Sequence, residues 1–342
     1  MRAEAVEAWV TGIFARAGVP HEAAHQVATT LVAADLEGIA SHGVMLVPMY
    51  VDRMLAGSVS LKTSAEIAHD GGTTVVLDAG NMLGQLSSIQ AVEILMKRAK
   101  AHGMASVAVR NGFHFGTAGH WARAIAAREL IGIALSNTRP LMPPPGGAER
   151  IVGNNPLAIA FPADERPVVV DMALSATAMG KIRLAEAAGH PIPEGWATDA
   201  EGRPTTDAAA AIKGMLSPAA GPKGFGLAVA IDLLCGGLSG GAITDQVNPL
   251  YGDVTQPYRC SHLFLALDPA AFGIQGLAQR VLHLREKIRD ARRGPGNDRI
   301  YAPGDLEQAR RAANAGECPL APEVVAKLNE CAARVGAERH FA

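Results

Sequence analysis

The sequence predicts an α/β fold in which a mixed middle region is inserted between helical N- and C-terminal segments. Two observations lead to this prediction. Residues 105–136 run from a short apolar stretch through a glycine-containing loop and an Ala-rich helical stretch to a second apolar stretch, the order of a strand–loop–helix–strand unit. Both ends of the chain instead place apolar residues at helical spacing, over residues 3–54 and 274–335.

Length and composition are those of an ordinary globular protein with ample core material. The 342 residues are 49% hydrophobic and 19% charged, with a formal net charge of −2. This length favours two lobes, which we place at residues 1–72 with 274–342 and at residues 73–273. The balanced charge gives no basic surface for nucleic acid or for a membrane. No apolar run is long enough for a membrane span, and residues 1–10 lack the form of a signal peptide.

The cysteines give no sign of a disulfide framework or of a zinc site. Their positions are 235, 260, 318 and 331, far apart and without CxxC spacing. We therefore expect free thiols in a cytoplasmic protein, and no metal.

The N-terminal segment is expected to form three helices. Residues 3–17 and 21–38 each carry an apolar stripe, and a third amphipathic stretch runs through residues 46–54. Ser41 and His42 precede this third helix. From the residues alone the favoured interpretation is a serine that caps the helix beside a solvated histidine.

The middle region is expected to alternate strands and helices, and the C-terminal segment to be helical. Short apolar runs predict the strands, and longer amphipathic or Ala-rich runs predict the helices. The strands are placed at residues 73–79, 105–110, 131–136, 157–161, 167–172 and 262–268, and the helices at residues 85–102, 118–128, 176–188, 227–238, 274–290, 306–313 and 322–335. Residues 196–207 are expected to form a loop, with Thr206 as the cap of a following helix.

The loop after the strand at residues 105–110 carries His114 between Phe113 and Phe115. Loops at the carboxyl ends of strands are common ligand sites in α/β proteins. The positive end of the next helix favours a neutral imidazole, which suits proton transfer near neutral pH. A histidine stacked in a packed turn explains the pattern equally well, because the pattern supplies a place and not a chemistry.

A second glycine-rich stretch, residues 221–226, carries Lys223 just before an apolar helix. Helix N-terminal amides together with a cation can bind phosphate, but such a stretch is also typical of a tight turn with positive φ. No segment fits GxGxxG after a strand, and none fits the P-loop pattern. A conventional Rossmann domain is therefore not supported, and a dinucleotide would need a non-Rossmann domain.

Six segments taken together resemble one known family. They are SHGV at 41–44 with Pro48 and Tyr50, HFGTAG at 114–119, GNNPLA at 153–158, DMA at 171–173 with Ser175 and with GK at 180–181, PKGFGL at 222–227, and PGNDR at 295–299. Over nearly its whole length the chain resembles the malate/L-lactate dehydrogenase-like oxidoreductases, which include ureidoglycolate and sulfolactate dehydrogenases and ketimine reductases. The resemblance implies a non-Rossmann fold, NAD or NADP as cofactor, a small-molecule substrate and a homodimer. It assigns substrate and subunit contacts to the helical lobe and the dinucleotide to the α/β lobe.

The same resemblance implies roles for individual residues. His114 matches the catalytic histidine that protonates the carbonyl or imine as hydride arrives, and a hydride acceptor does need such a proton donor. Ser41 and His42 match residues of the substrate pocket. The cofactor-contacting segments match Asp171, Met172, Ala173, Lys223, Gly224, Gly296, Asn297 and Asp298, among which Lys223 suits a phosphate.

Leu46 departs from the family pattern, which usually has at this position an arginine that grips the substrate carboxylate. Leucine cannot replace a bidentate cation. Either another cation takes over, for which Arg139 in the proline-rich loop is the candidate, or the substrate has no carboxylate at that spot. Phe113 stands where a more polar residue is common, so Leu46 and Phe113 together predict a less polar substrate pocket.

The sequence therefore predicts an NAD(P)-dependent oxidoreductase of a 2-oxo or 2-hydroxy acid, with His114 as proton donor and acceptor. One alternative is a reductase of a cyclic imino acid. Another is a non-catalytic descendant that lost the substrate arginine, although His114, Lys223 and the DMA segment argue against it. A hydrolase or lyase has no support, because no GxSxG or HExxH motif occurs.

Overall fold

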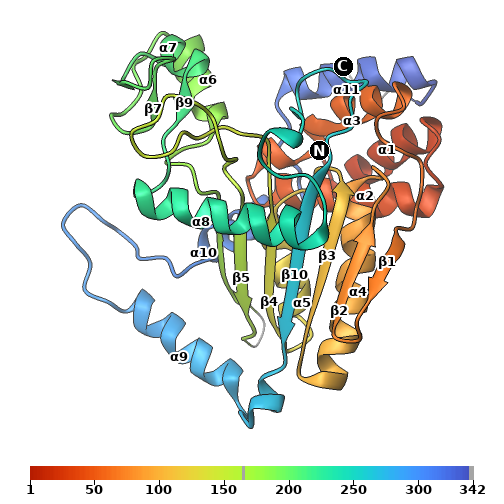
Figure 1. The fold of residues 1–342 in the computed structure, drawn as a ribbon, viewed down its shortest axis with the longest axis vertical. Coiled ribbons are helices and arrows are strands. Elements are labelled where there is room, and N and C mark those ends of the chain that lie inside the picture. Colours follow the sequence, from red (N-terminus) through yellow and green to blue (C-terminus); the bar gives the residue numbers. More distant parts are fainter. Residues whose placement is uncertain (164–165, 339–342) are drawn as a thin grey trace.

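The computed structural model describes residues 1–163 and 166–338, and it has a mixed α/β fold built on a seven-stranded sheet (Figure 1). The strand order is β1-β2-β3-β10-β4-β5-β6. The strands are β1 (Glu66–Asp70), β2 (Thr74–Asp78), β3 (Met104–Gly112), β10 (Cys260–Leu267), β4 (Ile131–Ser136), β5 (Leu157–Phe161) and β6 (Val168–Met172). The six predicted strands are confirmed. β1 is missing from the prediction, because all its residues are exposed and no apolar alternation marks it.

The strand directions bring several carboxyl ends to one edge of the sheet. β10 pairs antiparallel with both β3 and β4, so those two strands run in the same direction. β5 is antiparallel to β4, and β6 is antiparallel to β5, so β6 runs in the same direction as β3 and β4. β2 pairs parallel with β3. The loops that follow β2, β3, β4 and β6 therefore leave from the same edge, which we call the carboxyl edge.

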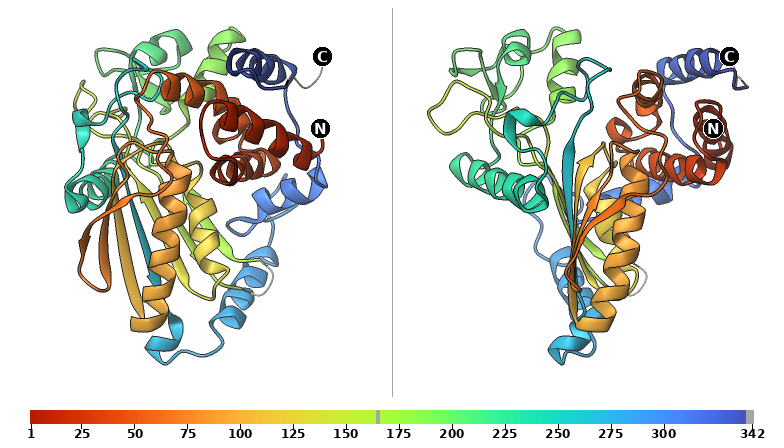
Figure 2. Two further views of the ribbon diagram at one scale, coloured as in Figure 1. Left: turned by 90° about the vertical axis from the view of Figure 1, so that its right-hand side faces the viewer. Right: turned by 45° about the vertical axis from the view of Figure 1, so that its right-hand side comes forward.

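Helices cover both faces of this sheet. α4 (Gly84–His102) and α5 (Ala118–Ala126) pack on one face, and α8 (Pro222–Asp232) lies on the other (Figures 1 and 2). Side chains of a strand alternate between the faces, so the central strand β10 supplies both cores. Phe264 packs with Trp121 and Leu95 on the α4 side, whereas Leu263 packs with Ile231 on the α8 side.

Helices from the two ends of the chain pack together over the carboxyl edge. They are α1 (Ala3–Arg16), α2 (His21–Leu36), α3 (Val47–Leu55), α10 (Asp305–Asn314) and α11 (Pro322–Val335). Glu37, at the end of α2, binds Arg123 of α5 at 2.6 Å and Arg311 of α10 at 3.5 Å. α9 (Leu277–Arg289) lies elsewhere, because its buried Val281 packs on Val168 of the edge strand β6. The division into two lobes stays a prediction.

The segment at residues 174–220 packs on the α8 side of the large sheet, with which it shares a core. It holds α6 (Met179–Ala187), α7 (Ala208–Lys213) and a second sheet of β8 (Pro204–Thr205), β7 (Ala197–Thr198) and β9 (Met215–Leu216). The predicted loop at 196–207 is therefore wrong in part, since it contains the β7–β8 hairpin. The predicted cap Thr206 is also wrong. Asp207 caps α7 instead, because its carboxylate accepts the N–H of Ala209 at 2.8 Å.

The glycine-rich stretch at residues 221–226 is helical rather than a loop, because α8 begins at Pro222. Proline suits the first helical position, and Gly221, at φ 62°, makes the turn that precedes it. Gly224 is required, because a Cβ there would overlap the carbonyl oxygen of Ala219. The helix continues into a π-helical turn, Leu233–Gly237.

Other sequence expectations concern membranes, thiols and metals. Within the described residues, every helix is too short or too polar to cross a bilayer. The four cysteines are free and buried. In the same part of the chain, no three His, Cys, Asp or Glu side chains gather in a way that could hold a metal ion.

Candidate active site

The predicted site residues leave the sheet along its carboxyl edge. His114 follows β3, Arg139 follows β4, and Asp171 lies near the end of β6. Ligands of α/β proteins commonly bind outside the carboxyl ends of strands. α3 reaches the same edge through Tyr50, whose hydroxyl oxygen lies 2.7 Å from Nδ1 of His114. The fold thus gathers residues that are far apart in the sequence.

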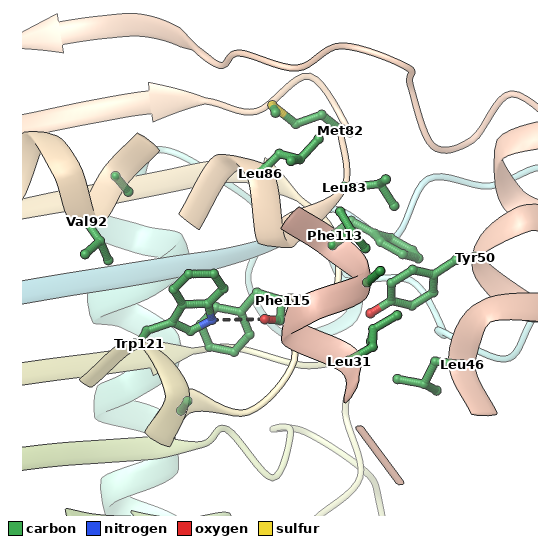
Figure 3. Close-up of a cluster of buried hydrophobic side chains, with 14 of the residues drawn as sticks. Leu31, Leu46, Tyr50, Met82, Leu83, Leu86, Val92, Phe113, Phe115 and Trp121 are labelled. Atoms are coloured by element: carbon green, nitrogen blue, oxygen red, sulfur yellow. Dashed lines mark hydrogen bonds between the residues drawn. The ribbon is translucent and has the colours of Figure 1, made fainter. Parts of the chain in front are cut away.

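The loop that presents His114 is anchored on both sides. Phe113 and Phe115 are only 1% and 3% exposed, whereas the His114 side chain is partly open. Trp121 of α5 donates its indole N–H to the carbonyl oxygen of Phe115 at 2.9 Å (Figure 3). On the other side, a Cβ at Gly84 would overlap the carbonyl oxygens of Phe113 and His114, so only glycine lets α4 begin this close.

Tyr50 can form a hydrogen bond with Nδ1 in either neutral tautomer of His114. Its hydroxyl oxygen accepts an N–H of Gln85 at 3.2 Å, and it lies 3.3 Å from the carbonyl oxygen of His114. When Tyr50 donates to that carbonyl, its oxygen is free to accept Nδ1–H of the ring; when it donates to Nδ1, the ring carries its proton on Nε2. Nδ1 also accepts a long hydrogen bond, 3.4 Å, from the backbone N–H of Gly116. Within the described residues, Nε2 of His114 has no hydrogen-bond partner, which leaves it available to a ligand.

The surroundings of His114 favour its neutral form. Burial is the main cause that lowers the pKa of His114 well below its usual value, and His42 and His262 lower it further. The rings of His42 and His114 have their centroids 5.2 Å apart. Burial also lowers the pKa of His42. Two neutral imidazoles at one site can accept protons near neutral pH.

Ser41 and His42 lie in a 3₁₀ turn, residues 40–42, ahead of α3. Ser41 Oγ lies 2.9 Å from Nδ1 of His42, and no side chain caps the turn or α3, so the helix-cap interpretation is wrong. The carboxylate of Asp35 holds the turn by accepting the N–H of Val44 at 2.8 Å. Burial raises the pKa of Asp35 to about 7.

Leu46 and Phe113 do not line an open pocket. Leu46 is 2% exposed and lies beside Tyr50 in the core between the helices (Figure 3). The less polar pocket expected from Leu46 and Phe113 does not follow, because covered side chains offer no surface to a substrate. The partly open or exposed side chains in this region include the polar Ser41, His42 and His114 and also the apolar Met45.

Arg139 lies on a loop whose beginning is fixed by buried hydrogen bonds. Asn137 donates to the carboxylate of Asp232 at 2.9 Å and accepts the N–H of Ser261 at 2.7 Å. Arg139 itself is partly covered, and in the described part of the chain it makes no hydrogen bond or ion pair. Burial lowers the pKa of Arg139, and nearby Arg150 adds to that effect. It is therefore a partly desolvated cation for which the described residues supply no anion.

Asp171, Met172 and Ala173 form an exposed end of β6. The Asp171 carboxylate accepts the N–H of Gly119 at 2.9 Å, in the first turn of α5. A Cβ at position 119 would overlap that carboxylate, so any larger residue there would displace the Asp171 side chain. Protein surrounds the carboxyl group even though the residue is exposed, and this burial raises the pKa of Asp171 to about 6. The end of β6 is thus joined to the helix that follows His114.

The other predicted cofactor residues differ in their placement. Lys223 and Gly224 lie in the first turn of α8, where Lys223 is exposed and Gly224 is buried. Gly296, Asn297 and Asp298 lie on an exposed arm, residues 290–299. The hydrogen bonds that the structure records for residues 293–298 stay within that stretch. The structure therefore does not join the arm to the residues around His114.

Sequence reasoning missed three residues that position the site. Gln85 and Asp35 carry no motif of their own, and their roles depend on contacts with distant segments. Tyr50 belongs to a family motif but was given no role. The one signal that could have found Tyr50 is its helical spacing from His42 and Leu46 on the same short segment.

A model of the malate/L-lactate dehydrogenase family matches residues 1–329. The (2R)-3-sulfolactate dehydrogenase (NADP(+)) of Chromohalobacter salexigens is 37% identical over 279 residues, covering 80% of this chain and 83% of that protein. The ureidoglycolate dehydrogenase (NAD(+)) of Escherichia coli O157:H7 is 34% identical over 304 residues, covering 87% and 86%.

Solved structures give the same result. The sulfolactate dehydrogenase of Methanocaldococcus jannaschii superposes with a TM-score of 0.92 at 33% identity, covering 99% of this chain and 98% of that one. The delta1-piperideine-2-carboxylate reductase of Pseudomonas syringae pvar. tomato superposes with a TM-score of 0.87 at 28% identity, covering 97% and 99%. The similarity therefore extends over the whole fold.

Proposed function

The chain belongs to the malate/L-lactate dehydrogenase family, a family of oxidoreductases that act on hydroxy acids, and we propose that it is an NAD(P)-dependent enzyme in which His114 transfers the proton. The substrate class is a 2-hydroxy acid and the corresponding 2-oxo acid. One observation carries the proposal. His114 sits on an anchored loop at the carboxyl edge, with Nδ1 engaged by Tyr50 and Nε2 left without a partner among the described residues.

The hydrogen bonds of His114 support proton transfer through Nε2. The nicotinamide, when bound, accepts or supplies the hydride. In the oxidation direction Nε2 takes the proton of the substrate hydroxyl, which requires the neutral tautomer with its proton on Nδ1. In that tautomer Nδ1 donates to Tyr50, and the long hydrogen bond from the N–H of Gly116 is given up. In the reduction direction the imidazolium returns that proton to the carbonyl oxygen. The lowered pKa of His114 favours the neutral form that oxidation requires.

The residues present fit a dinucleotide bound outside a Rossmann domain. The β2–β3 pair is the single parallel neighbour pair of the large sheet, whereas a Rossmann sheet is mostly parallel. Asp171, Met172 and Ala173 are open at the end of β6. Lys223 offers an exposed cation in the first turn of α8, and no described residue forms an ion pair with it. We assign these residues, with Gly224 and residues 296–298, to NAD or NADP, since relatives use each.

We assign the substrate to Ser41, His42 and Arg139. Ser41 and His42 stand beside His114, and Arg139 supplies the cation that Leu46 does not. A partly desolvated arginine without an anion partner is suited to a carboxylate. The variant Arg139→Ala should raise the KM for the acid about tenfold or more, with little change in the KM for the cofactor. An unchanged KM for the acid would remove Arg139 from the site.

We further propose a cytoplasmic homodimer. Four buried free thiols suit a reducing compartment. α8 and its π-helical turn expose Leu227, Leu233, Leu234 and Leu238, and an apolar stripe of this kind commonly marks a subunit contact. This stripe belongs to residues 73–273 rather than to the helical segments that the sequence assigns to dimerisation. Light scattering should give twice the mass of one chain, and a monomer would contradict the proposal.

A second candidate substrate is a cyclic imino acid. The likeness to a piperideine-2-carboxylate reductase favours it, and protonation of an imine nitrogen needs the same donor as protonation of a carbonyl oxygen. The residues around His114 are compatible with protonation of a carbonyl oxygen and of an imine nitrogen, so the substrate has to be found by assay.

The assay measures oxidation of NADH and of NADPH with 2-oxo acids and cyclic imino acids, and reduction of NAD and NADP with 2-hydroxy acids. Turnover of one class above the others would support the proposal and name the substrate. Cofactor binding without turnover on any member would contradict it and favour a non-catalytic member of the family.

A further inference from the structure

His262 contacts both residues that flank His114. It lies on β10, the central strand, and is fully buried. Its Nε2 lies 3.1 Å from the carbonyl oxygen of Phe113. Its ring stacks on the ring of Phe115, with centroids 4.3 Å apart and planes inclined by 3°. One buried side chain therefore holds the residue before His114 and the residue after it.

The hydrogen bonds of His262 fix its tautomer. A carbonyl oxygen only accepts, so Nε2 carries the proton and donates it to Phe113. Nδ1 then accepts a hydrogen bond from the Ser136 hydroxyl at 2.9 Å. Of the acceptors around this hydroxyl, Nδ1 is the nearest. Burial lowers the pKa of His262 to about 4, so the ring is neutral at neutral pH. Both ring nitrogens are used inside the protein, and neither is left for a substrate.

The surrounding strands leave room for this arrangement. Gly112 ends β3 opposite Cys260, and a Cβ at Gly112 would lie 3.0 Å from Nε2 of His262. Phe264, two residues along β10, also packs near Phe115, at 6.1 Å between centroids, but it offers no hydrogen bond. The contact with the Phe113 carbonyl is therefore specific to His262, whereas the apolar packing is shared.

We propose that His262 is a positioning residue, which fixes the Phe113–Phe115 loop through the Phe113 carbonyl and thereby aims the His114 ring at the substrate. The inference rests on the proposed role of His114. His262 touches no reacting atom and acts through the loop alone. Because proton transfer requires heavy atoms within hydrogen-bond reach, a small shift of this loop reduces turnover more than it reduces binding.

Three variants separate positioning from packing. In His262→Gln the amide nitrogen stands near the place of Nε2 and can still donate to Phe113, whereas the shorter His262→Asn reaches only the place of Nδ1. Phe264→Leu loosens the same core without touching the carbonyl. Each variant is measured for kcat, for cofactor KM, for Tm and for the NMR resonances of the ¹⁵N-labelled His114 imidazole. His114→Ala is measured alongside to give the kcat that remains when the imidazole is removed.

We expect His262→Asn to lower kcat about 10- to 100-fold with the cofactor KM nearly unchanged, and His262→Gln to recover most of that loss. Phe264→Leu should lower Tm but keep kcat within about threefold of wild type. The His114 resonances should shift in His262→Asn and stay in place in Phe264→Leu.

Equal kcat in wild type and His262→Asn would overturn the inference, and so would losses of kcat that follow Tm equally in all three variants. A His114→Ala variant as active as wild type would instead overturn the proposed function. In that case the His114 resonances still decide whether His262 fixes the loop.

Discussion

Two segments that the family resemblance assigns to one site are built in opposite ways. The His114 loop, residues 113–117, is held by Trp121, by His262 and by the close start of α4 at Gly84. The arm at residues 290–299 is exposed, and the hydrogen bonds recorded for residues 293–298 stay within it. The loop is held by other elements of the fold, whereas residues 293–298 of the arm make no recorded hydrogen bond to any other described part of the chain.

The difference matches the tasks proposed for the two segments. A proton donor has to be within hydrogen-bond reach of the reacting atom, and a displacement of about 1 Å can cost a hundredfold in rate. A segment that covers a bound cofactor can gain its contacts on binding, at the cost of ordering the chain at that moment. Substitutions should therefore affect stability and turnover in the loop, but binding alone in the arm.

Among the substitutions that compare the loop with the arm, Gly84→Ala has the largest expected effect, because it changes both stability and turnover. The added Cβ would overlap two carbonyl oxygens of the His114 loop, so α4 or the loop must move. We expect the unfolding free energy to fall by about 1–3 kcal/mol and kcat to fall about tenfold or more. Gly12→Ala is the matched control, because Gly12 is also helical but a Cβ there would meet nothing within 4 Å. Wild-type kcat in Gly84→Ala would show that the loop does not need this support.

A smaller effect is expected from Asp298→Ala in the arm. The residue is exposed and bonds through its backbone to Arg293, so Tm without cofactor should not change. The KM for NAD or NADP should rise about tenfold or less, which is the range of a lost hydrogen bond to a ligand. If Tm falls and the KM stays the same, the arm is a structural element and does not contact the cofactor.

The smallest effect on turnover is expected for Asp35, which supports the Ser41–His42 turn and whose influence is on stability and its pH dependence. Burial raises the pKa of Asp35 from 3.8 to about 7, so the folded protein keeps a proton that the unfolded chain has released. The contribution of Asp35 to stability must therefore fall as pH rises from about 4 to about 7, and then stay level. Asp35→Asn cannot ionise, and it keeps an oxygen for the N–H of Val44.

Denaturant titrations at several pH values would measure this difference. The unfolding free energy of wild type should decline relative to Asp35→Asn across that range, by up to about 4 kcal/mol. Parallel pH dependences in the two proteins would mean that Asp35 is ionised in the folded state throughout.

The local parts of the fold and site could be predicted, whereas the long-range parts could not. The strand–loop–helix unit around His114 depends on neighbours in the sequence, so periodicity and glycines reveal it. The insertion of β10 between β3 and β4 depends on pairing across about 125 residues, as with His262 and Ser136, and no local pattern encodes it. His262 and Gln85 gain their roles only through that assembly.

Leu46, which stands where the family resemblance places a substrate arginine, is a second case in which long-range packing could not be predicted. The sequence identifies Leu46 as a departure, but it does not show that the side chain turns into the core, because that depends on packing against helices formed elsewhere in the chain. Likewise, the glycines at residues 221–226 look like a loop, although Pro222 and close packing on Ala219 make them helical. Tertiary packing decides the position of Leu46, whereas a local feature, the proline in the first position of α8, decides the start of that helix.

The most direct test of the central claim is the kcat of His114→Ala beside its affinity for the cofactor. Because the ring is the proposed proton donor and acceptor, kcat should fall about 10²- to 10⁴-fold. The Kd for NAD or NADP should stay within about twofold of wild type, since Asp171 and Lys223 are untouched. A variant that keeps wild-type turnover, or that loses cofactor binding together with turnover, would contradict the account.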